Sequence, residues 1–499
     1  VSSGLEGDFH VPADDIFCVN FGGRDHHGIP FTKQIHLASM EQRTLWVTIP
    51  VPGRAGGKAE GSFTISLGDE SGTVRVRLKA EGETVARGGA DRPNRMTRLG
   101  WLNSDLALHG GPTGAYPPLR RQGDVLRILG RRLRIGSDGL PAEGYSFFDQ
   151  NLRVGEKAQK VFGRMAFALT FAGGKQADFI SEGVTFEPED GEGIRYTAVS
   201  HCGDLRLEVK GRSEFDGWNQ YEVMLTSAVQ TDIADISMIL PFEEGFETYM
   251  MGLGRKGGYR PECHDFHWNE EKHQSPVFIG GLNGGARVEF MGEDFVEPHV
   301  NIYYRHRPYH MSKSFCNGGK GGIRVEGIRG ATLTAYSGSR RMEAGECLRF
   351  DFSILLTPLK ELDTGKRFAA RYDQSWDAVD CVEEANRAGA NYINIHHANH
   401  ANPYINYPFI EKDRLRALSD EIHAAGLKMK LYYTVREFSD YAYEMQPFLS
   451  LGDEIYPRPR EGMESILWQP DTLKSFQQKY GETVIPAWKS DVDSALLTD

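Results

Sequence analysis

The segment that decides the fold is residues 391–434, in which two strands flank one helix. Its first strand and the loop behind it read NYINIHHANHANPYINYP over residues 391–408. A helix is predicted over Glu411–Ala425, because its apolar residues recur on one helical face. The second strand reads LKMKLYYT over residues 427–434. Alternation of strand and helix predicts parallel βα units, as in the first units of a (β/α)8 TIM-type barrel.

Further helices are predicted on both sides of this segment. An amphipathic stretch at Ser375–Ala388 is followed by Gly389, a residue that readily takes the left-handed conformation at a helix end. After the second strand, Ser439 can cap a third helix that ends before Gly452. Only two convincing parallel strands are present, whereas a barrel needs eight strands and about 250 residues. We therefore expect a truncated barrel, completed by a missing C-terminal segment or by a second chain.

The residues before this segment follow a different pattern, in which apolar and polar side chains alternate. Clear runs of this kind occupy residues 62–67, 73–78 and 204–209. Such alternation is typical of half-buried antiparallel strands. A hairpin is predicted within residues 124–135, with its turn at Gly130-Arg131, because Gly supplies the positive φ of a tight reversal.

Length and pattern together predict a multidomain protein that combines β and α/β architecture. The 499 residues exceed what one hydrophobic core organises. We expect a β-sandwich region over residues 1–356, which could comprise two sandwiches. The N-terminal part of a (β/α) barrel catalytic domain is expected over residues 357–499, with the boundary near residues 357–370.

Charge and composition argue against several classes of partner. Lys and Arg total 57 and Asp and Glu total 69, so the formal charge of −12 argues against nucleic acid or an anionic membrane surface. The chain has no run of eighteen apolar residues, and no membrane insertion is expected. The six cysteines include no CxxC pair, which leaves room for one or two disulfide bridges but indicates no zinc ribbon. A start at Val1 fits a removed signal peptide or a recombinant start equally well, and we expect a secreted or periplasmic bacterial protein.

Barrel enzymes carry their working residues at the C-terminal ends of the strands, and two such segments stand out here. The first follows the strand at 391–397 and concentrates side chains that hydrogen-bond sugar hydroxyls or stack on pyranose faces. The predicted substrate-binding residues of this loop are His396, His397, Asn399, Tyr404 and Asn406. The alternative is a structural loop whose His and Asn side chains satisfy backbone groups.

The second segment follows the strand at 427–434. Tyr433 and Arg436 are predicted to bind substrate, and Glu437 is the candidate catalytic carboxylate. Glycoside hydrolysis usually needs two carboxyl groups, one as acid and one as base, nucleophile or orienting group, and Glu437 could fill either role. The alternative is an Arg436–Glu437 ion pair at the rim of the barrel.

A metal site is a weaker interpretation of the first loop. His396, His397 and His400 lie within five residues of one another. Adjacent side chains on a strand point to opposite faces, so His396 and His397 would not easily bind one ion. We expect no metal and no cofactor.

Two further patterns favour structure over function. Asp453-Glu454 follows a helix end and is expected to be a solvated structural pair on the N-terminal side of the next strand. The glycine-rich stretch at residues 252–258 lacks the Gly-Lys-Ser/Thr ending of a phosphate loop. A turn that connects two strands is the expected structure there, although Arg255 and Arg260 could face the barrel mouth.

Six blocks of the sequence resemble the glycoside-hydrolase-like proteins related to glycoside hydrolase family 123. They are RLGWLNS (98–104), MGLGRKGG (251–258), VNIYY (300–304), GGKGG (318–322), NIHH (394–397) and NPYINYPF (402–409). The blocks keep the family's order and span most of the chain. The resemblance implies an N-terminal β-sandwich region and a C-terminal barrel, in exported bacterial proteins that act on complex glycans.

The resemblance also implies a reaction. Family 123 is associated with hydrolysis of β-N-acetylgalactosaminides, in which the substrate's own acetamido group attacks the anomeric carbon. An adjacent Asp and Glu after a later barrel strand assist it, and no such pair can be placed on this chain.

We therefore predict a glycoside hydrolase that acts on an oligosaccharide or polysaccharide, as a retaining enzyme of N-acetylhexosaminidase type. One alternative is a non-catalytic carbohydrate-binding protein. The other is a lyase or epimerase of uronic sugars, in which Arg255 and Arg260 would bind the carboxylate.

Overall fold

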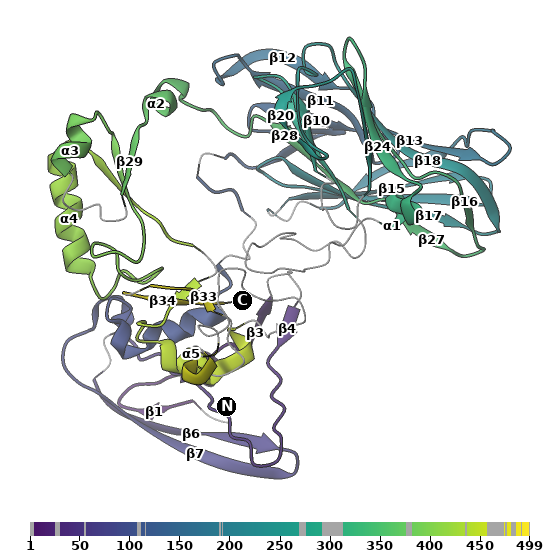
Figure 1. Cartoon of the computed structure of the whole chain (residues 1–499). Helices are drawn as coiled ribbons and strands as arrows, with labels where there is room; N and C mark the ends of the chain where they lie inside the picture. Colours follow the sequence, from purple (N-terminus) through teal and green to yellow (C-terminus); the bar gives the residue numbers. More distant parts are fainter. Residues whose placement is uncertain are drawn as a thin grey trace. The chain divides into compact units, whose positions relative to one another are not determined.

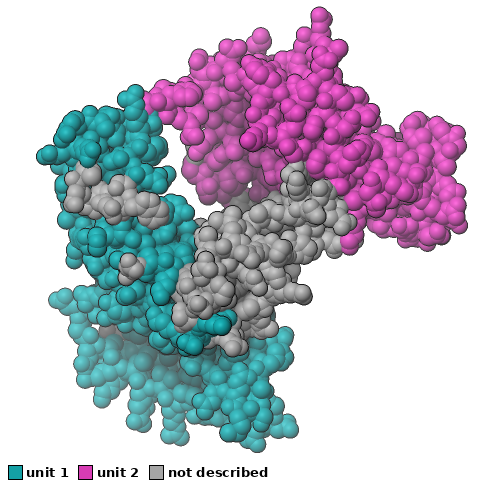
Figure 2. Space-filling model, in the orientation of Figure 1, with its two compact units in different colours: residues 1–107, 300–307, 370–499 teal, residues 108–299, 308–369 magenta. Residues whose placement is uncertain are grey.

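The structure is a computed structural model of the chain. It describes residues 4–24, 30–53, 56–106, 111–114, 116–188, 191, 193–268, 276–291, 313–375, 382–434, 437–456, 474, 477–480, 486–490 and 492–498. The chain divides into two compact units, which Figure 2 shows in teal and magenta. Unit 1 comprises residues 1–107, 300–307 and 370–499, and unit 2 comprises residues 108–299 and 308–369.

Unit 2 is a β-sandwich of two large antiparallel sheets (Figure 1). The 11-stranded sheet runs β21 (Cys263–His267), β24 (Gly322–Glu326), β25 (Ala331–Tyr336), β18 (Thr231–Phe242), β12 (Val154–Phe162), β11 (Pro141–Phe148), β10 (Arg131–Ile135), β9 (Val125–Ile128) and β8 (Arg120–Gln122), with β13 (Ala166–Phe171) and β26 (Arg340–Met342) paired to β18. The 10-stranded sheet runs β14 (Ile180–Phe186), β15 (Ile194–Cys202), β16 (Leu205–Ser213), β17 (Trp218–Ser227), β28 (Phe352–Thr357), β23 (Gly285–Phe290), β22 (Val277–Gly280), β19 (Tyr249–Gly252) and β20 (Arg255–Tyr259), with β27 (Cys347–Arg349) paired to β17. Short helices complete the unit at α1 (Lys313–Cys316), η6 (Asn317–Gly319) and α2 (Thr364–Ala369).

The alternating pattern of the sequence explains this sandwich. Every second residue of β16 and of β17 is buried, which places their apolar side chains in the shared core. One hydrophobic cluster, which includes Phe162, Tyr221 and Phe352, fills the space between the sheets. The described part of unit 2 is therefore one sandwich around one core rather than two sandwiches.

The predicted hairpin forms, with its turn one residue earlier than expected. Arg131 pairs with Ile128, so Leu129-Gly130 forms the two-residue turn, and Gly130 has φ 60. Arg131 belongs to β10 and is buried, because its guanidinium donates to the carbonyl oxygens of Leu356 and Leu359 at 2.7 and 2.8 Å. These bonds hold it in the strand rather than in the turn.

The N-terminal residues of unit 1 form small antiparallel sheets of their own. The sheets are β1 (Glu6–Gly7), β6 (Gly57–Leu67) and β7 (Glu70–Ala80); β2 (Phe17–Cys18) and β5 (Val47–Thr48); and β3 (Gly22–Arg24) and β4 (Pro30–Thr32). Short 3₁₀ segments are η1 (Ala13–Asp15), η2 (Ala86–Gly89), η3 (Pro93–Arg95) and η4 (Thr97–Asn103). By contacts, residues 1–107 group with residues 370–499. The division of the chain into domains at residues 356 and 357 stays a prediction.

Within its described residues, the barrel segment of unit 1 contains three parallel strands. β29 (Tyr372–Ser375), β30 (Tyr392–Ile395) and β31 (Lys428–Leu431) pair in that order, with α3 (Val382–Arg387) and α4 (Lys412–Ala424) between them in sequence. The expectation of two strands was one short, because β29 reads YDQS and lacks the apolar pattern of a buried strand. Ser375 ends this strand instead of starting a helix. Residues 376–381 lie outside the described residues.

A second small sheet follows the parallel one. β32 (Glu437–Ser439), β34 (Ser494–Leu497) and β33 (Pro486–Lys489) are antiparallel, with β34 in the middle, and α5 (Met445–Leu451) and η7 (Gly452–Glu454) follow β32 in sequence. The prediction that Ser439 caps the third helix was wrong. Ser439 is a buried strand residue whose hydroxyl donates to Asp493 at 2.7 Å, and the helix begins six residues later, at Met445.

Two expectations about the whole chain can be compared with its described parts. The five cysteines in the described ranges are free thiols, so they form no bridge among themselves, and Cys381 lies outside those ranges. Within the described ranges, no helix is long and apolar enough to cross a membrane.

Candidate active site

The carboxyl ends of β30 and β31 bring together several of the predicted residues. The two strands are parallel, so the residues that follow them emerge at the same edge of the sheet. His396 follows β30 directly, and Tyr432 follows β31 directly. Their rings stack with centroids 4.2 Å apart and planes 12° apart. The result is a stack of aromatic rings at the strand ends, which we call the aromatic surface.

His397 extends this surface and is held uncharged. Its ring lies 4.3 Å from that of His396 and 4.3 Å from that of Trp488, which belongs to β33. Burial, and then the neighbouring His396, lowers the pKa of His397 to about 4. His396 and His397 would point apart if the strand continued through His397, but it ends at Ile395 and the two rings lie side by side.

Asn399 shapes the loop behind β30. Its Oδ1 accepts hydrogen bonds from the backbone N–H groups of Ala401 and Asn402, both at 2.9 Å. Its Nδ2 donates to the carbonyl oxygen of His396 at 2.9 Å. In these bonds the side chain satisfies backbone groups, as in a structural loop. Substrate binding by Asn399 stays a prediction.

Asn406 ties the same loop to the segment after β31. Its Nδ2 donates to the carbonyl oxygen of Glu437 at 2.6 Å, and its Oδ1 accepts from the N–H of Thr434 at 2.9 Å. Its φ of 54 lies in the left-handed region, which Asn tolerates better than most residues. Asn406 therefore positions the backbone on both sides of residues 435 and 436.

Glu437, the predicted catalytic carboxylate, begins β32. The residue is 4% exposed, and the Thr434 hydroxyl donates to its Oε2 at 2.6 Å. Arg436 lies outside the described residues, so its predicted role and the alternative Arg436–Glu437 ion pair stay predictions. The structure places Glu437 beside the two loops that carry the other candidates.

Tyr433 bonds to Asn402, which is not among the site residues predicted from the sequence. Its hydroxyl donates to Oδ1 of Asn402 at 3.1 Å, and burial raises the pKa of Tyr433 to about 12. Asn402 is 1% exposed. Its place in the quoted loop was the one signal in the sequence that could have identified it.

Tyr404 stacks on Tyr441, with ring centroids 4.9 Å apart. The next residue, Ile405, donates its N–H to Oδ2 of Asp493 at 2.8 Å. The loop is therefore anchored to the turn that precedes β34.

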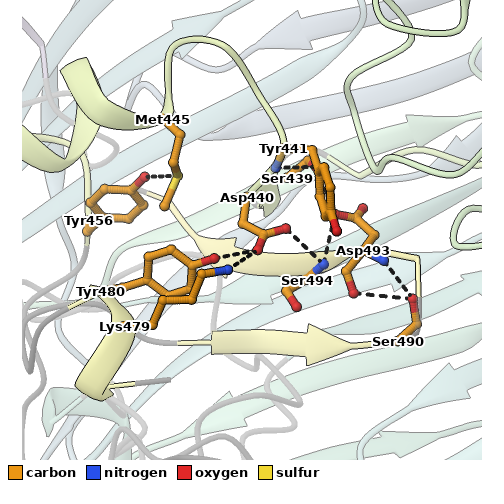
Figure 3. Close-up of polar contacts among 10 residues, drawn as sticks. All are labelled: Ser439, Asp440, Tyr441, Met445, Tyr456, Lys479, Tyr480, Ser490, Asp493 and Ser494. Carbon is orange, nitrogen blue, oxygen red and sulfur yellow. Dashed lines mark hydrogen bonds and ion pairs between the residues drawn. The ribbon is translucent and has the colours of Figure 1, made fainter. Parts of the chain in front are cut away.

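Asp493 and Asp440 form the polar network of Figure 3. The Oδ1 of Asp493 accepts from the Ser439 hydroxyl at 2.7 Å and from the Ser494 N–H at 2.8 Å. Burial raises the pKa of Asp493 to about 7, although these bonds and the one from Ile405 oppose the rise. Asp440 accepts from Lys479 at 3.0 Å, from the Tyr480 hydroxyl and from the Ser494 N–H at 3.1 Å. Both carboxyl groups are engaged in holding β34 against β32.

Two sequence models of one protein family match the chain in succession. The model described as "Glycoside hydrolase 123, third domain" matches residues 119–358. The model described as "Glycoside hydrolase 123, TIM-barrel domain" matches residues 363–497. The chain belongs to the glycoside hydrolase 123 family. The family resemblance and the fold class expected from the sequence are thereby confirmed, with a β-sandwich ahead of a TIM-barrel segment.

Three solved structures that are similar to this family 123 chain share little sequence identity with it. The Slr1438 protein from Synechocystis sp. PCC 6803 has 9% identity and a TM-score of 0.26, over 50% of this chain and 97% of that chain. A galactose mutarotase related enzyme from Lactobacillus acidophilus has 7% identity and a TM-score of 0.29, over 49% and 98%. Alpha-N-acetylgalactosaminidase NagBb from Bifidobacterium bifidum has 10% identity and a TM-score of 0.30, over 75% and 64%. No curated protein matches the chain.

The glycine-rich stretch of the family 123 sandwich is a strand connection, as expected. β19 and β20 form a hairpin that turns at Leu253-Gly254. The guanidinium of Arg260 donates to four backbone carbonyls, those of Glu247, Pro261, Gly327 and Gly330, at 2.7–3.3 Å. Arg260 therefore braces neighbouring loops, and binding of a sugar carboxylate by Arg255 and Arg260 stays a prediction.

The three histidines of the loop after β30 and the pair Asp453-Glu454 were weaker candidates in the sequence. Among the described residues of the family 123 chain, no three His, Cys, Asp or Glu side chains are grouped to hold a metal ion. Glu454 bonds to Lys33 at 2.7 Å and to Asn20 at 3.2 Å. Glu454 is thus structural, as expected, but it binds the N-terminal segment rather than solvent.

Proposed function

We propose that this family 123 chain hydrolyses a glycosidic bond of a complex glycan, as a retaining enzyme of N-acetylhexosaminidase type. The observation that carries the proposal is the aromatic and amide surface at the carboxyl ends of β30 and β31, inside the matched TIM-barrel domain. Flat rings stack on the C–H faces of pyranoses, and neutral polar groups bond their hydroxyls. Family membership supports a carbohydrate as the substrate class.

The proposed reaction follows the mechanism implied by the family resemblance. The acetamido oxygen of the substrate forms a bond to the anomeric carbon while the bond from that carbon to the leaving oxygen breaks. A protonated carboxyl group supplies the proton that the leaving oxygen takes up. Water then forms a bond to the anomeric carbon while the bond from that carbon to the acetamido oxygen breaks. The carboxylate left by the first step takes up the proton of the water, and the original anomeric configuration is restored.

Glu437 is proposed as one of the two carboxyl groups that this reaction needs. It begins the strand next to the aromatic surface, and its position is set by Thr434 and by the Asn406 bond to its backbone. From there it would either protonate the leaving oxygen or orient the acetamido N–H. Its low exposure keeps it among protein groups rather than bulk water.

The test compares Glu437→Gln with Glu421→Gln, an exposed residue of α4, on an aryl β-N-acetylgalactosaminide. We expect Glu437→Gln to lower kcat at least about 100-fold, the usual contribution of general acid–base catalysis, and to change sugar affinity by less than about twofold. Glu421→Gln should leave both values as in the wild type. Unchanged turnover in Glu437→Gln would remove this residue from the reaction.

A non-catalytic carbohydrate-binding protein is the second candidate, and one observation favours it. Three other carboxyl groups of this region, Asp440, Glu444 and Asp493, are all engaged by protein groups. Binding of the glycoside without release of the aryl group by the wild type would support this candidate and exclude the hydrolase.

We also propose that the protein is secreted or periplasmic, because complex glycans are encountered outside the cytoplasm. Fractionation of the native host tests this proposal. Recovery of the protein in the cytoplasmic fraction alone would contradict export.

A further inference from the structure

Three buried polar atoms at the strand ends have no hydrogen-bond partner within the described residues. They are the Nδ1 of His397, the Nδ2 of Asn402 and the Nε1 of Trp488. His397 is 9% exposed, and Asn402 is 1% exposed. A buried donor or acceptor that stays unbonded costs free energy, so such atoms are rare in folded proteins.

The three side chains come from two segments, the loop after β30 and the strand β33. The rings of His397, after β30, and Trp488, in β33, are 4.3 Å apart. Asn402 is fixed by the Tyr433 hydroxyl at 3.1 Å, and Tyr433 and Trp488 pack against the same hydrophobic cluster around Ile405. Three unsatisfied atoms therefore occur in one region, and each belongs to a side chain that its neighbours hold in place.

Three polar side chains in the same region are, by contrast, fully bonded. Asn399, Asn406 and Asp493 bond to backbone or hydroxyl groups through both of their side-chain heteroatoms. The neighbouring polar side chains thus have protein partners for their hydrogen bonds. The three unbonded atoms can bond to a water or to a ligand. An ordered water can fill such a place until a ligand replaces it.

We infer that His397, Asn402 and Trp488 form a preorganised subsite for an uncharged pyranoside, an inference that rests on the proposed function. Asn402 Nδ2 and Trp488 Nε1 can only donate, so they suit the oxygens of a hydroxyl or an acetamido group. The neutral imidazole of His397 can donate or accept, which suits a hydroxyl. The rings of Trp488 and His397, tilted 42° to one another, supply apolar surface beside these polar atoms.

The same chemistry disfavours an anionic sugar. None of the three residues carries a positive charge at neutral pH. Two cations of unit 1, Arg98 and Lys479, are paired with Glu444 and Asp440. A uronate would bring its charge against these three neutral, partly buried groups and lose hydration that they do not replace.

The test is calorimetric titration of the full chain with N-acetylgalactosamine and with galacturonic acid. We expect the neutral sugar to bind at least about tenfold more tightly than the uronic acid. The variants His397→Phe and Trp488→Phe keep an aromatic ring but remove the two imidazole nitrogens and the indole N–H, respectively, and each should weaken binding of the neutral sugar about tenfold. Trp46→Phe is the matched control, because the Nε1 of Trp46 already donates to Ser450 at 2.9 Å. It should bind like the wild type.

The outcomes separate this inference from the proposed function. Loss of binding in the folded His397 and Trp488 variants, in a protein without turnover, would support the subsite and remove the hydrolase. Normal turnover with an unchanged KM in both variants would overturn the subsite and leave the hydrolase standing. Equal affinity for the two sugars would overturn the inferred preference for an uncharged ligand. Circular dichroism and a thermal melt establish that each variant is folded before it is titrated.

Discussion

Arg98 and Glu444 are 346 residues apart in the sequence and form a buried ion pair in unit 1. The Nε of Arg98 donates to Oε1 of Glu444 at 2.8 Å, and the Tyr407 hydroxyl donates to Oε2 of Glu444. The guanidinium also donates to the Tyr407 hydroxyl oxygen at 3.0 Å and lies 3.8 Å from the ring centroid of Phe409. An N-terminal segment thus bonds to the loop that carries the candidate site.

The first prediction concerns this ion pair. Arg98→Met should lower the free energy of unfolding by about 3–5 kcal/mol, because it leaves the Glu444 carboxylate buried without its counter-ion. Urea denaturation at pH 7 measures the change. The control Arg341→Met breaks an exposed pair with Asp232, in which both side chains are more than half exposed, and should cause no measurable change. Equal stability of the two variants would contradict the burial of Glu444.

The second prediction separates the hydrogen bonds of the Asn406 side chain from the left-handed conformation of its backbone. Asn406→Gly removes the bonds to Thr434 and Glu437 but tolerates a positive φ, and we expect it to cost about 1–3 kcal/mol of stability. Asn406→Ala removes the same bonds and also strains the backbone, so it should cost about 1 kcal/mol more. Thermal or urea unfolding gives both values. An alanine variant as stable as the glycine variant would argue against the left-handed backbone.

The third prediction follows from the lowered pKa of His397, which is about 4 in the folded chain and about 6.5 in an unfolded one. Between these values the unfolded chain takes up a proton that the folded chain does not. The contribution of His397 to the free energy of unfolding should therefore fall as the pH drops from 6.5 to 4, and His397→Phe should lack this contribution. Urea unfolding across this range measures the difference. Substitution of the exposed His423 by Gln is the control and should retain the wild-type slope.

The fourth prediction concerns Asp493, whose contribution to stability changes with pH in the opposite direction to that of His397. The pKa of Asp493 is raised to about 7, against about 3.9 in an unfolded chain. From pH 4 to 7 the folded chain keeps a proton on Asp493 that the unfolded chain has lost, so the contribution of Asp493 to the free energy of unfolding should fall as the pH rises. Asp493→Asn should remove this slope, which is at most about 1.4 kcal/mol per pH unit for one group. The slopes are compared rather than the absolute stabilities, because Asn cannot reproduce every hydrogen bond of the carboxyl group. A variant with the wild-type slope would contradict the raised pKa.

Several elements could be predicted because their pattern is local. The alternation in β16 and β17 indicates which residues face the core, since a strand reverses its side-chain direction at every residue. Leu415, Leu418 and Ile422 of α4 are buried, as their helical spacing predicts. The strand–loop order also placed His397 and Tyr433 at the same edge, because parallel strands end on the same side.

Other features of the structure have no local pattern in the sequence that would predict them. β29 is short and polar, so its pairing with β30 becomes visible only in the sheet. Trp488 and Asp493 lie beyond the predicted loops, and nothing in their neighbours along the chain indicates that they reach His397 and Ile405. Ser439 has the residue type of a helix cap, yet its pairing in β32 and its bond to Asp493 place it in a strand.

The sequence by itself determined the order of the architecture, from alternating strands to βα units, and the family to which those blocks belong. Periodicity and turn residues act over a few positions, and a sequence displays them directly. Only the tertiary structure decided which distant groups meet, as Arg98 meets Glu444 and His397 meets Trp488. The physical reason is that burial and hydrogen bonding depend on neighbours in space. Whether a histidine is neutral, or an amide unsatisfied, is settled by residues that the chain brings together when it folds.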